Sequence, residues 1–343
     1  MILYIGNKLS RHGITPTSVD TLGEKLKESF QIKTISDKKN KIIRFLDIIW
    51  EITKHRKDTQ LILIDTYSTW NFYYAVISAF LAIKFSINYI PILHGGTLPE
   101  KLINSPKLSR FLFGNSLTNI SPSTYLYEAF VKHGYKVEHI PNSIDINQYP
   151  FKLREIYRPR LLFVRSFHKI YNPEMAVKVL YELQKKYEDA LLCMVGPDKD
   201  GSLERVKKLV EKFKLSDKVN FTGKLQKKEW IALSSEYDIF INTTNFDNHP
   251  VSVIEGMALG LPVVSTKVGG IPYLINHEED GLLVPAEDVN KFVKAIDQLI
   301  KGPDVSKKIA INARKKAESF SWDEVEQKWK ELINRSLQKP VFN

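Results

Sequence analysis

Short apolar segments recur along the whole chain, roughly every 25 to 35 residues, and helix-length stretches separate them. Such segments are too short for helices, and their continuous apolar character is typical of strands buried in a parallel sheet. The alternation predicts successive βαβ units and therefore an α/β fold. We expect strands at residues 2–5, 61–64, 89–93, 117–120 and 137–140, and again at 160–164, 190–195, 219–221, 239–241, 262–265 and 281–284.

The series of segments shifts around residues 147–152, where a polar stretch with a proline precedes a new strand. A chain of 343 residues is long enough for two domains with separate cores. We therefore expect two doubly wound, Rossmann-like domains facing each other across a cleft, over residues 1–150 and 151–321. The remaining segment, 322–343, begins with an amphipathic helix expected from Trp322 to about Leu337.

Glycine and polar residues directly follow many of the expected strands. In doubly wound domains the carboxyl ends of parallel strands meet at one edge of the sheet, where ligands bind. Candidate site residues are expected at this edge, and they include Gly6, Asn7, Asp65, His94, Arg165 and Asp247.

The net charge of +11 indicates an acidic partner. Nucleic acid is not expected as a partner, because the chain has no helix-turn-helix, zinc-finger or RNA-binding motif. Phosphorylated ligands and an anionic membrane surface are the other interpretations. The single cysteine, Cys193, lies within an apolar run and is expected to be a buried, inert thiol. With a strand-length apolar start and no disulfide framework, we expect a cytoplasmic protein.

Two further segments bear on membrane contact. Residues 72–83 are almost wholly apolar but fall short of the roughly 20 residues of a spanning helix, so a buried helix of the α/β layer is expected. Residues 38–57 are apolar with basic ends. They suit either a helix packed on its sheet or a helix lying on a membrane surface, and the sequence favours the former.

The segment 243–264 places two carboxylates, Asp247 and Glu255, around an expected helix start. Pro250 suits the first helical position, and Gly260 suits a left-handed cap at the far end. Backbone N–H groups at such a helix start form a ready anion site. The segment therefore suits a ligand that carries both phosphate and hydroxyl groups.

A second motif lies directly after the strand expected at 160–164. Arg165 follows that strand and Lys169 lies four residues later, before a helix that begins near Pro173. Two cations at a strand-to-helix turn suit a diphosphate. Surface cations on an ordinary loop are the alternative.

With these motifs the chain resembles the family 4 retaining glycosyltransferases, the glycosyl transferases group 1, which have the GT-B fold. The family signature has two glutamates separated by seven residues, followed by Gly-x-Pro-Val. This chain keeps Glu255 and Gly260-Leu261-Pro262-Val263 but has Asp247 in the first position. In the second motif, Val164 replaces the usual glycine and Lys169 comes one residue early. The resemblance implies that segment 322–343 packs back on the first domain.

The resemblance also implies roles for individual residues. The catalytic set is Asp247, His94, Arg165 and Lys169. Asp247 would hold hydroxyls of the donor sugar, and His94, which resembles the His-Gly pair of the family, would meet that sugar from the first domain. Glu255 would bind the ribose, while 221–225 resembles the turn that binds the base. The donor-binding set is Gly6, Asn7, Arg165, Lys169, Gly223, Leu225, His249, Pro250, Val251, Ser252 and Glu255.

The implied activity is a retaining transfer from a nucleoside diphosphate sugar to a glycan or lipid-linked acceptor, as in cell-surface polysaccharide synthesis. No metal or other cofactor is expected, and Asp198-Lys199-Asp200 is interpreted as a solvated turn. Three alternatives stay open: a sugar-nucleotide epimerase, a phosphorylase, and a non-catalytic subunit that binds nucleotide sugars. Association with the cytoplasmic face of a membrane is a further expectation.

Overall fold

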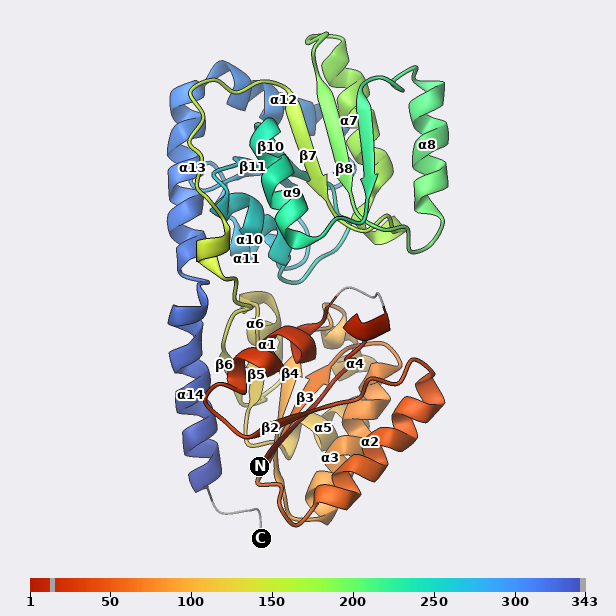
Figure 1. Cartoon of the computed structure of the whole chain (residues 1–343), viewed down its shortest axis with the longest axis vertical. Coiled ribbons are helices and arrows are strands. Elements are labelled where there is room, and N and C mark those ends of the chain that lie inside the picture. The colour runs from red at the N-terminus through yellow and green to blue at the C-terminus, as the bar shows by residue number, and fades with distance from the viewer. Residues whose placement is uncertain (13–15, 340–343) are drawn as a thin grey trace. The chain divides into compact units, whose positions relative to one another are not determined.

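The computed structural model describes residues 1–12 and 16–339, and it divides the chain into two compact units (Figure 1). Unit 1 is Met1–Pro141 with Asp323–Asn343, and unit 2 is Asn142–Trp322. The boundary lies ahead of the linker expected at 147–152. Most of the segment expected as a final helix belongs to unit 1, and its last residues, 340–343, lie outside the described part of the chain.

In its described residues, unit 1 contains a parallel six-stranded sheet in the order β2-β1-β3-β4-β5-β6. Its strands are β1 (Ile2–Ile5), β2 (Ile32–Ile35), β3 (Leu61–Thr66), β4 (Asn88–Leu93), β5 (Asn119–Ser121) and β6 (Val137–His139). Its helices are α1 (Ser18–Leu26), α2 (Lys41–His55), α3 (Asn71–Lys84), α4 (Leu98–Asn104), α5 (Pro106–Gly114), α6 (Thr124–Lys132) and most of α14 (Trp322–Gln338).

Edge strand β2 was not predicted from the sequence. It is four residues long, and its two central residues, Lys33 and Thr34, are only partly buried. Such a strand has no apolar run, and its position next to β1 depends on backbone pairing, for example Tyr4 opposite Thr34.

Unit 2 contains, in the residues described, a second parallel six-stranded sheet in the order β12-β11-β10-β7-β8-β9, and each of its strands was predicted. They are β7 (Arg160–Val164), β8 (Leu191–Val195), β9 (Val219–Gly223), β10 (Ile239–Asn242), β11 (Val263–Thr266) and β12 (Leu282–Val284). The helices are α7 (Pro173–Gln184), α8 (Ser202–Lys212), α9 (Lys227–Leu233), α10 (Val251–Ala258), α11 (Ile271–Leu274), α12 (Val289–Lys301) and α13 (Pro303–Glu318).

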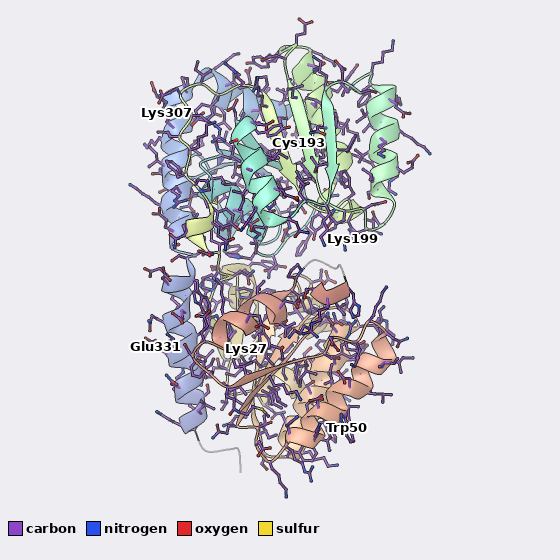
Figure 2. The ribbon with its side chains drawn as sticks, in the orientation of Figure 1. Lys27, Trp50, Cys193, Lys199, Lys307 and Glu331 are labelled. Atoms are coloured by element: carbon purple, nitrogen blue, oxygen red, sulfur yellow. The ribbon has the colours of Figure 1, made fainter. Side chains whose placement is uncertain are left out.

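Alternate residues of each unit 2 strand face opposite sides of the sheet, and both sides are covered. On β7, Leu161 and Phe163 join one apolar cluster while Leu162 joins another. Cys193 on β8 is buried in the second cluster, as predicted, and burial raises the pKa of its thiol (Figure 2). Burial on both sides explains why these strands appear as continuous apolar runs.

Helix α3 corrects one expectation, because only one side of it is buried. Phe72, Ala75 and Ala79 pack into the core of unit 1, whereas Tyr73 and Phe80 are exposed. Within the described residues, no helix combines the length and the apolar character that a membrane span requires.

Candidate functional site

The two sequence motifs of unit 2 meet at the carboxyl ends of neighbouring strands. Arg165 directly follows β7, and Asp247 lies in the loop after β10, which pairs with β7 in parallel. The Arg165 Nη2 donates to Asp247 Oδ2 in an ion pair, and the side chains are only 15% and 14% exposed. The guanidinium also lies 4.7 Å from the centre of the Tyr171 ring. The structure thus joins the predicted diphosphate-binding cation to the predicted sugar-binding carboxylate.

Burial and a nearby cation act on Asp247 in opposite directions. Burial raises the pKa of Asp247, and the charge of Arg165 and the amide of Asn248, at 2.8 Å from Oδ1, only partly offset this effect. A tightly folded loop fixes the position, since the amide of Gly270 donates to the Asp247 carbonyl at 2.8 Å. A Cβ on Gly270 would lie 1.8 Å from the Asn248 carbonyl oxygen, so this approach requires glycine.

Helix α10 begins at Val251, one residue later than expected, because Pro250 has the extended ψ of 109° typical of an N-cap. Gly260 has the predicted left-handed conformation, with a φ of +75°. The first N–H groups of a helix have no acceptor within it. Moreover, Ser252 Oγ and Arg165 Nε are buried, and within the described residues neither has a hydrogen-bond partner. These groups can hold an anion at this place.

Glu255 is buried on α10 rather than displayed on an exposed helix face. Its Oε1 accepts a hydrogen bond from the Tyr149 hydroxyl at 2.7 Å and forms an ion pair with Lys227, the first residue of α9. The Lys227 ammonium also donates to the Tyr149 hydroxyl at 3.1 Å. Burial, together with the negative charge of Glu255, raises the pKa of Tyr149. Two residues that the sequence did not point to, Tyr149 and Lys227, therefore contact this buried carboxylate.

The predicted base-binding turn leads into this cluster. Strand β9 ends at Gly223, which has a φ of +69°, and its carbonyl accepts from the Gly196 amide at 2.8 Å. Leu225 packs against the apolar cluster beside β8 and α10. The turn then enters α9 at Lys227, so Gly223 and Leu225 lie on the connection that brings Lys227 to Glu255.

His249, the last member of the donor-binding set on this loop, precedes Pro250. Its ring lies 5.4 Å from the ring of Phe320, edge to face.

No described contact brings the Lys169 ammonium to the Arg165–Asp247 pair. Lys169 is exposed, and it forms no ion pair with any described residue. Its backbone amide donates to Asp200 Oδ2 at 3.0 Å. The carboxylates of Asp198 and Asp200 accept from the amides of Gly201 and Ser202 at 3.1 Å each. Hydrogen bonds from Ser202 and the Lys169 amide lower the pKa of Asp200 to about 2. These two aspartates therefore stabilise a turn.

In unit 1, His94 follows β4 and pairs with a buried carboxylate. Its Nε2 lies 2.8 Å from Asp65 Oδ1, which also accepts from the Tyr4 hydroxyl at 2.8 Å. The sequence pointed to Asp65 only through its strand-end position. The Asp65 side chain has no exposed surface, and its Oδ2 is without a hydrogen-bond partner in the described residues. Such a carboxylate fixes the orientation and tautomer of an imidazole.

Gly6 and Asn7 lie beside Asp65. A Cβ on Gly6 would lie 2.6 Å from Asp65 Oδ2, so glycine is needed for this approach. The Asn7 Oδ1 accepts from Arg44 Nη1 at 2.7 Å. Gly6, Asn7, Asp65 and other side chains line a small cavity of about 10 Å³, which is about the space of one water molecule.

Comparisons with known proteins identify the family that the chain resembles. Residues 146–316 match the family described as glycosyl transferases group 1. An uncharacterized glycosyltransferase of Haemophilus influenzae is 27% identical over 183 residues, which are 53% of this chain and 51% of the relative. The chain spans about half or less of the length of the curated relatives it matches first.

Solved structures resemble the whole chain. A sucrose-phosphate synthase from Thermosynechococcus elongatus has a TM-score of 0.78 at 17% identity, covering 97% of this chain and 98% of its own. The HepE protein of Anabaena, solved with UDP and glucose, has a TM-score of 0.75 at 16% identity, covering 97% of this chain and 99% of its own. These likenesses establish the GT-B fold. Through residues 146–316, the chain belongs to the glycosyl transferases group 1 family.

Proposed function

We propose that the protein is a retaining, metal-independent glycosyltransferase that moves a sugar from a nucleoside diphosphate sugar to a glycan or lipid-linked acceptor. One observation carries the proposal. The partly buried Arg165–Asp247 pair lies within residues 146–316, which also contain a helix start with unpartnered polar atoms. The complex of HepE with UDP and glucose supports a nucleotide-sugar donor.

The chemistry assigned to unit 2 is the stabilisation of a departing diphosphate. As the bond between the sugar and the phosphate oxygen breaks, negative charge grows on the diphosphate. The guanidinium of Arg165 and the first amides of α10 would oppose that charge, each with hydrogen bonds already oriented. Asp247 would accept hydrogen bonds from hydroxyls of the sugar. A donor site of this kind needs no metal ion, because the cation and the helix supply the positive charge.

Glu255 would bind the two ribose hydroxyls through Oε2, because Tyr149 and Lys227 occupy Oε1. Within the described residues, Oε2 has no hydrogen-bond donor. A carboxylate oxygen has two acceptor positions, so Oε2 could accept from both hydroxyls.

The assignments of Lys169 and His94 rest on the family resemblance. In the retaining reaction, the acceptor oxygen would bond to the sugar on the face from which the diphosphate departs. A departing phosphate oxygen would take the proton of the acceptor hydroxyl in the same step. No separate protein base is then needed. Lys169 would approach the diphosphate and His94 the donor sugar.

The proposed setting is cell-surface polysaccharide synthesis, at the cytoplasmic face of a membrane. The net charge of +11 supports contact with phosphorylated donors and with anionic lipid.

The test is thermal unfolding with a panel of nucleoside diphosphates and their sugars, followed by product analysis without added metal and with a chelator. Free ligand at about 100 times Kd should stabilise the protein by about 2.7 kcal/mol. The anomeric configuration of the product then reports retention. Binding without turnover on any acceptor would indicate a binding subunit, and isomerisation of the donor alone would indicate an epimerase. Transfer that requires inorganic phosphate would indicate a phosphorylase.

A further inference from the structure

Helix α2 exposes a stripe of large apolar side chains on the side opposite its core. Arg44, Ile48 and Ile52 face inward and are buried. Opposite them, Ile42, Leu46 and Trp50 recur every four residues and are 72%, 58% and 63% exposed, with Ile43 beside them at 54%. Trp50, on the outer helix of unit 1, is labelled in Figure 2. A continuous exposed apolar stripe of this kind marks a contact surface.

Helix α3 continues the apolar surface. Tyr73, Phe80 and Ile83 are 45%, 48% and 42% exposed, whereas Phe72, Tyr74 and Ala75 of the same helix are buried. The two helices touch, since the Tyr74 hydroxyl donates to the Lys41 carbonyl at 3.0 Å and its ring lies 6.0 Å from that of Phe45.

The sheet topology places α2 and α3 on the same face of the sheet. The connections β2-α2-β3 and β3-α3-β4 step across the sheet in the same direction. Right-handed crossovers therefore place both helices on one face of the sheet, side by side (Figure 1). The two stripes form one surface, which we name the α2–α3 face: Ile42, Ile43, Leu46, Trp50, Tyr73, Phe80 and Ile83.

Cations border this face and are not neutralised. Lys39, Lys41, Lys54 and Lys57 lie at the two ends of α2, are exposed, and form no ion pair within the described residues. The acids of α2 are used elsewhere. Asp47 accepts from the Ser36 hydroxyl, and Glu51 pairs with Lys33 at 2.5 Å. The face is thus apolar at its centre and positive at its rim.

We propose that the α2–α3 face docks on the surface of an anionic lipid bilayer. Apolar side chains on the outer side of a helix, with tryptophan and tyrosine among them, suit the boundary between headgroups and acyl chains. Lysines at the rim attract anionic headgroups. The helix lies on the membrane, because its other side packs into the core of unit 1. An anionic membrane satisfies both the apolar centre and the cationic rim. The proposal deepens the proposed membrane setting by naming the surface that binds. Its tests measure vesicle binding, so they do not depend on glycosyl transfer.

The first test is sedimentation of the full chain with lipid vesicles. We expect binding to vesicles of phosphatidylcholine mixed with phosphatidylglycerol, weak binding to phosphatidylcholine alone, and weaker binding as salt is raised. Absence of binding to the anionic vesicles would overturn the proposal.

The second test separates this face from the overall positive charge. Leu46→Ser with Trp50→Ser should weaken binding about tenfold or more. Ile156→Ser with Val305→Ser removes apolar side chains of unit 2 that are 67% and 47% exposed, and it should leave binding unchanged. The proposal would be contradicted if both double variants lost vesicle binding equally, or if neither lost it.

The third test concerns the rim. Lys54→Ala with Lys57→Ala should weaken binding to the anionic vesicles by about fivefold per lysine. Lys207→Ala with Lys212→Ala removes two exposed lysines of α8 and should have little effect. If the α8 pair mattered as much as the α2 pair, binding would follow net charge and not this face.

Two further readouts exclude other occupants. Vesicles should shift the tryptophan emission to shorter wavelength in the wild type but not in Trp50→Phe, which should still sediment with vesicles. All variants should keep the thermal unfolding and the nucleoside diphosphate stabilisation of the wild type. If Leu46→Ser with Trp50→Ser converted a dimer to a monomer while vesicle binding stayed intact, the face would be an interface between copies of the chain.

Discussion

The guanidinium of Arg165 pairs with the partly buried carboxylate of Asp247 and, in the proposed reaction, also opposes the charge of the departing diphosphate. Arg165→Ala should therefore lower kcat by about 10² to 10³, the usual effect of removing one such donor. Steady-state kinetics with the identified donor would measure this effect.

The control is Arg205→Ala, because Arg205 is an exposed arginine of the same unit, paired with Glu174 at 3.0 Å. Unfolding should be measured for both variants, since breaking a buried ion pair can cost about 3–5 kcal/mol. A folded Arg165→Ala protein with wild-type turnover would show that this residue does not stabilise the leaving group.

The raised pKa of Asp247 leads to a prediction of how the reaction rate depends on pH. Burial raises the pKa of Asp247 above its ordinary value of 3.8, and only the carboxylate can accept hydrogen bonds from sugar hydroxyls at both oxygens. Activity should therefore rise with pH through this raised pKa. Asp247→Asn should lower kcat/KM and remove that acid limb, which a pH profile of both proteins would record.

The contribution of Asp247 to folding stability should fall as the pH rises, whereas activity should increase. A raised pKa in the folded state means that the contribution of Asp247 is fully present below pH 3.8 and is lost as the pH rises through the raised value. In urea unfolding, Asp247→Asn should thus gain stability relative to the wild type as the pH increases. If the unfolding free energy of Asp247→Asn instead fell relative to that of the wild type as the pH increased, the raised pKa would be contradicted.

At the scale of elements, the turn after β8 sets the position of Arg165. Gly196 has a φ of +153°, and a Cβ there would lie 2.0 Å from the Arg165 carbonyl oxygen. Gly196→Ala must move the end of β7, so we expect a loss of about 1–3 kcal/mol in stability and weaker donor binding. Calorimetric titration with the donor nucleotide and thermal unfolding would measure both effects.

Gly201→Ala is the matched control. Gly201 also has a left-handed φ, +79°, but no atom lies within 4 Å of its added Cβ. The Gly201→Ala protein should lose about 1–2 kcal/mol of stability, while its affinity for the nucleotide should equal that of the wild type. Equal affinity loss in the two variants would show that the turn does not act through Arg165.

Elements that depend on apolar runs were predictable, and elements that depend on tertiary contacts were not. The strands of unit 2 follow from their apolar segments, whereas β2 is an edge strand with Lys33 at its centre. Arg165 and Asp247 were predicted as one site because each follows a parallel strand. Lys227 and Tyr149 were missed because they are far from Glu255 in the sequence, and only the fold brings them to its carboxylate.

The sequence also could not show the outer side of α3. A run such as Phe80 to Ile83 predicts a helix that is apolar, but it does not say which residues the sheet covers. The structure covers one side of α3 and leaves the other exposed. The turn at Asp198–Asp200, in contrast, was predictable, because its structure depends on local sequence and not on packing against the sheet.

At the scale of the whole molecule, the proposed tasks fall on different units. The diphosphate contacts belong to unit 2, and the α2–α3 face belongs to unit 1. Hydrogen–deuterium exchange with the donor nucleotide should therefore protect residues 165–171, 223–227 and 247–255. Exchange with anionic vesicles should instead protect α2 and α3, because lipid excludes water from their outer sides.

Variants should remove the two patterns of protection separately. Arg165→Ala should abolish the nucleotide protection and leave the vesicle protection intact, while Leu46→Ser with Trp50→Ser should do the reverse. Because each variant serves as the folded control for the other, a general loss of structure cannot produce this crossed result. Loss of both patterns in either variant would mean that the site and the membrane surface are not separate, and the assignment of one task to each unit would fail.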